Sequence, residues 1–352
     1  MIEYEFFGTS HGKGYGGVVR GLPSGFVVDV RFVNRQLQLR KCGYGRSARQ
    51  LYPDAVHFVG EQDGKFTTSD KVEFFVANHS DNTKPLCDIT ALRSGHADVV
   101  GQARFPQMSV RDIEEIASAR SSVCYVVLGA ICKQILDTYD VFTYSFTKQI
   151  GDVVCVERCC KPPVADSESE LDLLRCPSQE SAKRMAQAID EARKNNDSLG
   201  GVTVVCAEGV PMGVGEIVPY TQRLEAQIFG ALAGIPSVKC VSLGEWRNYD
   251  GQSGRQLADK LTLGQKGQIE YDTNNCGGIV GGLSNGKPIV VELVVKPIPT
   301  VSGVETIDNV THERVQAHVE RADTCVVPNV GIIGENILAT VLLNQMMKQG
   351  LI

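Results

Sequence analysis

One stretch, from Ser109 to Leu136, constrains the fold most strongly. Ser109 and Asp112 are typical of a helix N-cap followed by an acidic first turn. The residues that recur after them at helical spacing are apolar: Ile113, Ile116, Ala117, Val123, Val127, Ile131 and Ile135. Towards its C-terminal end this helix is apolar over much of its surface. We therefore expect other layers of structure to bury it.

The remaining elements favour an α+β fold. Further helices are predicted over residues 178–194, 221–232 and 334–348, and strands over 25–32, 71–76, 201–206 and 288–295. Because strands and helices do not alternate regularly, a doubly wound α/β sheet is disfavoured. The 43% of hydrophobic and 22% of charged residues are typical of a globular protein. The length of residues 1–352 fits one large domain or two ordinary ones, and no shift in composition marks a division.

Charge and cysteine content narrow the classes of partner. The chain has 35 Lys and Arg against 41 Asp and Glu, a net charge of −6, which argues against nucleic acid. Seven basic residues nevertheless lie between Arg20 and Arg49 with one acid, Asp29, which fits either an anionic ligand or a solvated face. Apolar runs such as 123–130 are far shorter than the ~20 residues of a membrane helix, and MIEYEFF lacks a basic leader. The 12 cysteines contain no C-x-x-C pair, so we expect reduced thiols, no metal site and a cytoplasmic location.

Three candidate residues for chemistry stand beside glycines or charges. His11 lies in the glycine-rich G-T-S-H-G turn, where a ligand can reach an imidazole that exchanges protons near neutral pH. His96 lies in R-S-G-H-A-D beside Asp98, and Asp323 lies near Arg321. Taken singly, each is more typical of a surface turn or a solvated charge than of a site. Neither glycine cluster, 8–17 or 274–286, matches a nucleotide P-loop or a Rossmann fingerprint.

The order of these motifs along the chain resembles the chorismate synthase family, from residue 8 to about residue 345. The matching segments are Gly8–Pro23 with its spaced glycines, Arg40-Lys41-Cys42-Gly43 with Arg46, Arg93–Asp98, Ser118-Ala119-Arg120, Gly209–Glu216, Ile235–Lys239, Asn274–Gly282, Lys296–Thr300 and Arg321–Val326. The resemblance implies a single α+β domain with helices packed between antiparallel sheets, assembled as a homotetramer.

The resemblance also implies the activity. The expected reaction is the anti 1,4-elimination of phosphate from 5-enolpyruvylshikimate 3-phosphate to give chorismate, with reduced FMN as cofactor and an external flavin reductant. It assigns His11, His96 and Asp323 to catalysis. The substrate would contact Ser10, Arg40, Arg46, Arg120 and Arg321, and the flavin would contact His96, Asn275, Cys276 through its backbone, Lys296 and Thr300.

The stretch Ile113–Ser121 departs from the pattern. A glycine-rich turn is lost there, and two acids, Glu114 and Glu115, stand where a ligand should approach the backbone closely. Unless these acids point to solvent, they should disfavour an anionic ligand. Three hypotheses follow: a working chorismate synthase, a paralogue that binds flavin or an anionic ligand with altered or lost activity, and a flavin-free structural module.

Overall fold

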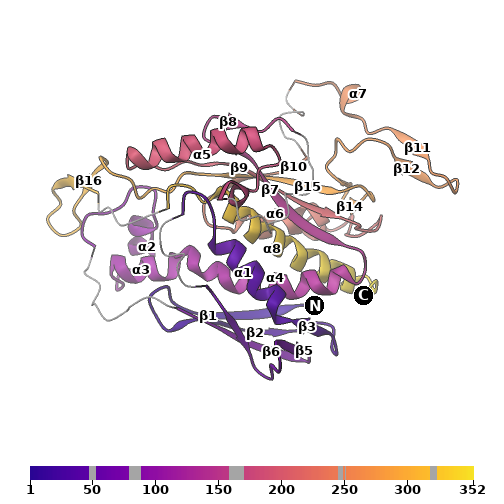
Figure 1. Cartoon of the computed structure of the whole chain (residues 1–352), viewed down its shortest axis with the longest axis horizontal. Helices are drawn as coiled ribbons and strands as arrows, with labels where there is room; N and C mark the ends of the chain where they lie inside the picture. The colour runs from indigo at the N-terminus through magenta and orange to yellow at the C-terminus, as the bar shows by residue number, and fades with distance from the viewer. Residues whose placement is uncertain (47–52, 79–88, 158–169, 245–248, 250, 318–322) are drawn as a thin grey trace.

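The computed structural model describes residues 1–46, 53–78, 89–157, 170–244, 249, 251–317 and 323–352. Figure 1 shows a layered arrangement in which the central helices α1, α4 and α8 lie between two sheets. Helix α5 covers the outer side of the second sheet, and the hairpin β11–β12 projects away from the body. The layers confirm the expected α+β architecture, with helices packed between antiparallel sheets.

The helices are α1 (Val30–Lys41), α2 (Asp98–Arg104), α3 (Val110–Ala117), α4 (Ser122–Asp137), α5 (Gln179–Lys194), α6 (Leu224–Ala233), α7 (Gly254–Leu257) and α8 (Val327–Lys348), with 3-10 turns η2 (Ala119–Ser121), η3 (Glu170–Leu174) and η4 (Tyr220–Gln222). The strands of the first sheet are β1 (Glu3–Gly8), β2 (Gly14–Arg20), β6 (Lys71–Ala77) and β4 (Val56–Phe58), in that order. Those of the second sheet are β10 (Val238–Leu243), β15 (Ile289–Val295), β9 (Gly201–Glu208), β7 (Phe142–Ile150) and β8 (Val153–Val154). Short pairs are formed by β3 (Val27–Asp29) with β5 (Lys65–Thr67), β11 (Leu261–Leu263) with β12 (Ile269–Tyr271), β13 (Ile279–Val280) with β14 (Leu283–Ser284), and β16 (Glu305–Ile307) with β17 (Arg314–Gln316).

The first glycine cluster serves packing more than ligand binding. Its second half lies in β2, the strand between β1 and β6. A Cβ on Gly16 would lie 2.6 Å from the ring of Phe7 and 2.8 Å from the carbonyl oxygen of Phe74, so only glycine fits there. The turn formed by residues 9–12 is therefore the part of this cluster that remains available to a site.

The central helices make the core. Helices α4 and α8 approach so closely that a Cβ on Gly129 would lie 2.3 Å from the carbonyl oxygen of Asn336. By length and composition alone, the stretches Val110–Asp137 and Val327–Lys348 could cross a membrane. However, 56% and 78% of their apolar windows are buried inside the protein, as in core helices of globular proteins. The burial that the sequence predicts for the stretch 109–136 is therefore confirmed.

A polar cluster is enclosed in this core. The carboxylate of Glu335 on α8, 2% exposed, accepts hydrogen bonds from Lys133 Nζ at 2.7 Å and from Ser145 Oγ at 2.6 Å, and Arg175 Nη2 lies 3.2 Å away. The carboxylate is thus fully surrounded by donors, which is what makes its burial tolerable.

Several predicted elements were placed correctly and others were wrong. Helix α5 begins after its cap Ser178 and ends before Asn195, as expected. The strand predicted over 25–32 ends at Asp29, where α1 begins. The single helix predicted from Ser109 is two helices, because the chain turns at Ser118 and η2. The last helix begins at Val327, seven residues earlier than expected.

Candidate active site

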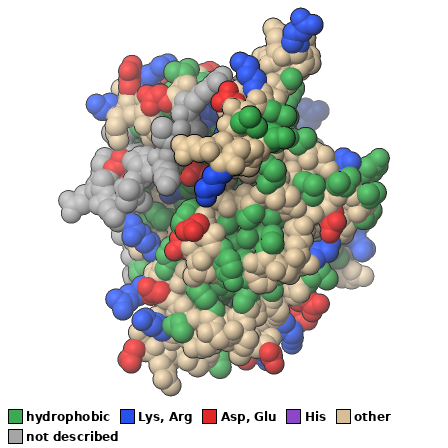
Figure 2. Space-filling model, turned by 90° about the vertical axis from the view of Figure 1, so that its right-hand side faces the viewer, with side chains coloured by type: hydrophobic (Ala, Val, Ile, Leu, Met, Phe, Trp, Pro, Cys, Tyr) green, Lys and Arg blue, Asp and Glu red, His purple; other side chains and the backbone are tan. Residues whose placement is uncertain are grey.

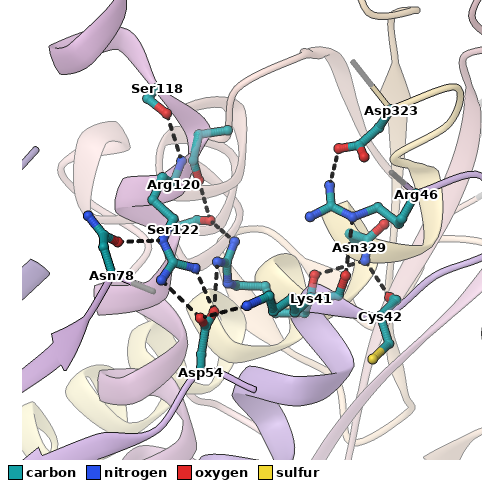
Figure 3. A network of polar contacts seen from close by, with 12 residues as sticks. Lys41, Cys42, Arg46, Asp54, Asn78, Ser118, Arg120, Ser122, Asp323 and Asn329 are labelled. Carbon is teal, nitrogen blue, oxygen red and sulfur yellow. Dashed lines mark hydrogen bonds and ion pairs between the residues drawn. The ribbon is translucent and has the colours of Figure 1, made fainter. Parts of the chain in front are cut away.

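A buried carboxylate, Asp54, gathers three of the basic side chains near α1 (Figure 3). Arg120 donates to it through both terminal nitrogens, at 2.6 and 2.9 Å. Lys41 Nζ lies 3.2 Å and Arg40 Nη2 3.4 Å from the same carboxylate, whose side chain is 0% exposed. Burial alone would raise the pKa of Asp54, but the hydrogen bonds and charge of Arg120, with the charges of Arg40 and Lys41, lower it to about 2. Asp54 is therefore ionised at neutral pH.

The C-terminal turn of α1 presents these cations. Arg40 and Lys41 occupy the last turn, where the helix dipole favours positive charge. The amide of Asn329 on α8 donates to the carbonyls of Arg40 at 2.8 Å and Cys42 at 2.6 Å, which fixes the end of the helix. Burial, and next the charge of Arg120, lower the pKa of Arg40 to about 9, which still leaves it protonated at pH 7.

The loop after α1 binds the segment before α8. Arg46 Nη1 donates to Asp323 Oδ2 at 2.5 Å, and its Nε donates to the carbonyl of Lys41 at 3.2 Å. The backbone N–H of Thr324 donates to the carbonyl of Gly45 at 2.8 Å. Both Arg46 and Asp323 side chains are 20% exposed, so a ligand can reach this pair.

The turn at residues 9–12 is attached to the cation cluster through Asn78. The Asn78 amide nitrogen donates to the carbonyls of Thr9, Ser10 and Gly12 at 3.1, 3.1 and 2.9 Å. Its oxygen accepts from Arg120 Nε at 3.1 Å. One side chain thus fixes the turn that carries His11 relative to the guanidinium of Arg120.

The two unexpected acids do not point to solvent. The Glu115 carboxylate accepts from the backbone N–H of His11 at 2.9 Å and contacts His11 Nδ1 with its other oxygen. Glu114 lies 3.2 Å from Arg93 Nη1 and 2.6 Å from Arg111 Nη1. Each carboxylate is paired with cationic or N–H donors inside the protein, so the acids do not face solvent. Their effect on an anionic ligand stays a prediction.

His96 belongs to a second buried ion pair beside α2. Its Nδ1 lies 2.6 Å from Asp98 Oδ1, and Arg93 donates to both oxygens of Asp98 at 2.9 and 3.0 Å. Burial alone would raise the pKa of Asp98, but hydrogen bonds from His96 and then Arg93 hold it well below its usual range. A carboxylate that accepts from Nδ1 fixes the orientation of the imidazole ring, as carboxylates do behind many functional histidines.

The residues expected to contact a flavin fall into two groups. Lys296 Nζ donates to the carbonyl of Gly95 at 2.6 Å, beside His96, and Thr300 follows in the loop after β15. Burial, and next the charge of Lys239, lower the pKa of Lys296. The second group, Asn275 and Cys276, comes just before Gly277, whose carbonyl accepts from the backbone N–H of Val290 near the start of β15. Along this seven-residue strand, Val290 lies about 20 Å from Lys296.

In the second group, the backbone N–H groups that would donate to a flavin already have a partner. The N–H groups of Asn275 and Cys276 donate to the carboxylate of Asp259 at 2.6 and 3.0 Å. The residues around His96 and Lys296 therefore fit one end of an anionic cofactor. The contact of Asn275 and Cys276 with a flavin stays a prediction.

The structure thus joins Ser10, His11, Arg40, Arg46, Arg120 and Asp323 through one network of contacts, and leaves Asn275 and Cys276 apart from it. Arg321 lies outside the described residues. Sequence reasoning missed Asp54 and Asn78, for which the only local signals are a Pro before Asp54 and a strand ending before Asn78. In the described part of the chain, no group of three or more His, Cys, Asp or Glu side chains could hold a metal ion.

Comparison with known proteins supplies the family. The family model described as chorismate synthase matches residues 2–347. The chain is 32% identical to a chorismate synthase of Carboxydothermus hydrogenoformans, covering 99% of this chain and 94% of the relative, and 34% identical to one of Rubrobacter xylanophilus, covering 95% and 89%. A crystal structure of a chorismate synthase superimposes with a TM-score of 0.77 at 28% identity, over 99% of this chain and 92% of that one. The chain belongs to the chorismate synthase family.

Proposed function

We propose that residues 1–352 act as one catalytic unit that converts 5-enolpyruvylshikimate 3-phosphate to chorismate and phosphate. The observation that carries this proposal is the set of three cations around Asp54, attached by Asn78 to the turn of His11. One carboxylate neutralises one of the three positive charges, so two remain to attract an anion. A partly buried site strengthens such attraction relative to bulk water. A substrate with one phosphate and two carboxylates suits this excess of charge.

The side chains divide the elimination between them. The C3–O bond breaks with its electron pair leaving on phosphate, a proton leaves C6, and the π electrons shift to form the second ring double bond. Arg40, Arg120 and Ser10 bind and orient the phosphate end, where planar guanidinium groups suit bidentate contacts. His11 provides a proton to the departing phosphate, and Asp323, held by Arg46, assists the removal of the C6 proton.

We further propose reduced FMN as the cofactor, which would supply electron density to the ring while the phosphate leaves. His96 and Lys296 would hold one end of this cofactor, because Lys296 donates to the carbonyl of Gly95, the residue before His96. Thr300 would contribute from the loop after β15, next to Pro299, which lies against Gly95. Asn275 and Cys276 lie at the far end of β15, so they would serve a flavin held by a second copy.

A homotetramer would bring such copies together, and exposed apolar surface supports it. Figure 2 shows hydrophobic side chains gathered over the centre of one face. Among the large apolar side chains that are exposed, Val218 is 69%, Tyr220 73% and Leu263 72% accessible. Apolar side chains gathered on one face are typical of interfaces. We further propose a cytoplasmic location and an external flavin reductant.

An anaerobic assay tests the proposed activity. Purified protein is mixed with reduced FMN and 5-enolpyruvylshikimate 3-phosphate, and chorismate and phosphate are measured together. Equal, catalytic amounts of both products are the expected result. Bound flavin without turnover would instead favour a paralogue with altered or lost activity. If the protein neither binds flavin nor turns over the substrate, the result would favour a structural module.

A further inference from the structure

Glu115 contacts the same residue, His11, with both of its carboxylate oxygens. One oxygen accepts from the backbone N–H of His11 at 2.9 Å, and the other contacts the ring nitrogen Nδ1. Ser10 Oγ lies 3.2 Å from the same Nδ1. The side chains of His11 and Glu115 are 22% and 14% exposed, so the contact is largely protected from water.

Both partners are fixed from outside the contact. Glu115 lies on α3, whose first turn is closed by the capping box of Ser109 and Asp112. The turn of His11 is fixed by Asn78, which donates to three of its carbonyls. The backbones that carry the two side chains are therefore held in place.

The charge on Glu115 decides which ring nitrogen carries the proton. Burial alone would raise the pKa of Glu115, but hydrogen bonds from the backbone and ring of His11, and from Ser10, lower it. An ionised carboxylate only accepts hydrogen bonds. Nδ1 of His11 must therefore donate, and proton exchange with a ligand falls to Nε2.

We propose that Glu115 is the positioning residue of His11: it accepts from Nδ1–H, so that the imidazolium gives the proton on Nε2 to the departing phosphate and the neutral ring left behind keeps its proton on Nδ1. This inference rests on the proposed function for the role of His11, but the contact itself does not. Carboxylates that hold a catalytic histidine by Nδ1 act in this way, by fixing the tautomer and stabilising the imidazolium.

Among the described residues, Tyr15 on β2 links the pair to the nearby charged side chains. The charge of Glu115 contributes to raising the pKa of Tyr15, after burial, while the charges of Arg120 and Arg40 oppose it and Cys124 adds to it. Arg120 donates to Asp54, and neither guanidinium can accept a hydrogen bond from Nδ1.

Nitrogen NMR of the imidazole rings tests the proposal on the full-length chain. The protein is labelled with ¹⁵N-histidine, and the signals of His11 among the 6 histidines are identified by their loss in His11→Gln. We expect the neutral ring of the wild type to carry its proton on Nδ1. In Glu115→Gln, whose amide can donate to Nδ1, the signals should move to the Nε2–H form. Glu114→Gln is the matched control, since Glu114 pairs with Arg93 and Arg111, and it should keep the wild-type tautomer.

Kinetics supply the second readout. Glu115→Gln should lower kcat about 100-fold, the lower end of general acid–base contributions, and change KM less than about threefold. A wild-type ring protonated on Nε2, or a tautomer unchanged in Glu115→Gln, overturns the proposal. The wild-type spectrum decides even if the variant does not fold. If the protein shows no turnover while the tautomer shifts as expected, the proposed function fails and the positioning contact stands.

Discussion

Replacing Asp54 by Asn tests how the cation cluster is held together. Asp54 is the only carboxylate that the described residues place against Arg40, Lys41 and Arg120 together, with its side chain 0% exposed. Asn keeps the size of the side chain but removes its charge, so Asp54→Asn leaves three neighbouring cations without their counter-ion. We expect the folded state to be destabilised at neutral pH.

The magnitude follows from the pKa of Asp54. A fall from 3.8 to about 2 corresponds to about 2.5 kcal/mol of stability carried by the ionised carboxylate. Removing one partner of a buried pair typically costs about 3–5 kcal/mol, because unpaired charges remain. Since the folded-state pKa lies below the unfolded one, this stabilisation is complete above about pH 5. It is lost as the pH falls towards 2, and about half of it remains at pH 3.

Urea unfolding followed by circular dichroism measures the effect. The free energy of unfolding of Asp54→Asn should be lower than that of the wild type by about 2.5–5 kcal/mol at pH 7, with a smaller gap at pH 3. Glu73→Gln is a suitable control, because its pair with Lys71 is exposed and should contribute less than about 1 kcal/mol. A loss below about 0.5 kcal/mol, or a gap that does not change with pH, would refute the reasoning.

Three further predictions concern the site and the core. His11→Ala should lower turnover about 100-fold while leaving the flavin dissociation constant unchanged in an anaerobic titration; wild-type turnover would remove His11 from the mechanism. Arg46→Ala should raise the substrate dissociation constant about 10- to 100-fold in equilibrium binding, because a charge-assisted hydrogen bond contributes about 1.5–3 kcal/mol; unchanged affinity would count against it. Glu335→Gln should lower the urea-measured stability by about 3–5 kcal/mol, because Lys133 and Arg175 lose their partner, and a change under 1 kcal/mol would contradict this.

Local signals predicted elements where capping and periodicity agreed. Helix α5 has both, with Ser178 at its start and Asn195 at its end. The local signals failed at α1, because the β-branched and aromatic residues up to Phe32 indicate a strand. The side chain of Asp29 instead accepts from the backbone N–H of Arg31 at 2.9 Å and starts a helix. Pro328 lies in the first turn of α8, where proline is typical of a helix start, but the apolar pattern alone did not indicate that the helix begins there.

The break between α3 and α4 shows why the site was harder to predict. Ser118 Oγ accepts from the backbone N–H of Arg120 at 3.3 Å, which competes with the helix and begins the 3-10 turn. Arg120 then reaches Asp54, a residue 66 positions away in the sequence. Motif order identified the cations, but pairs such as Asp54 with Arg120, or Glu115 with His11, form across distant elements and leave no local pattern.

A crystal structure of the protein with 5-enolpyruvylshikimate 3-phosphate tests the central claim most directly. We expect the substrate phosphate within hydrogen-bonding distance of His11 and of Arg40 or Arg120, with a substrate carboxylate or the ring facing the Arg46–Asp323 pair. Phosphate density elsewhere, with Arg40 and Arg120 still paired only to Asp54, would contradict the assignment of this cluster as the substrate site.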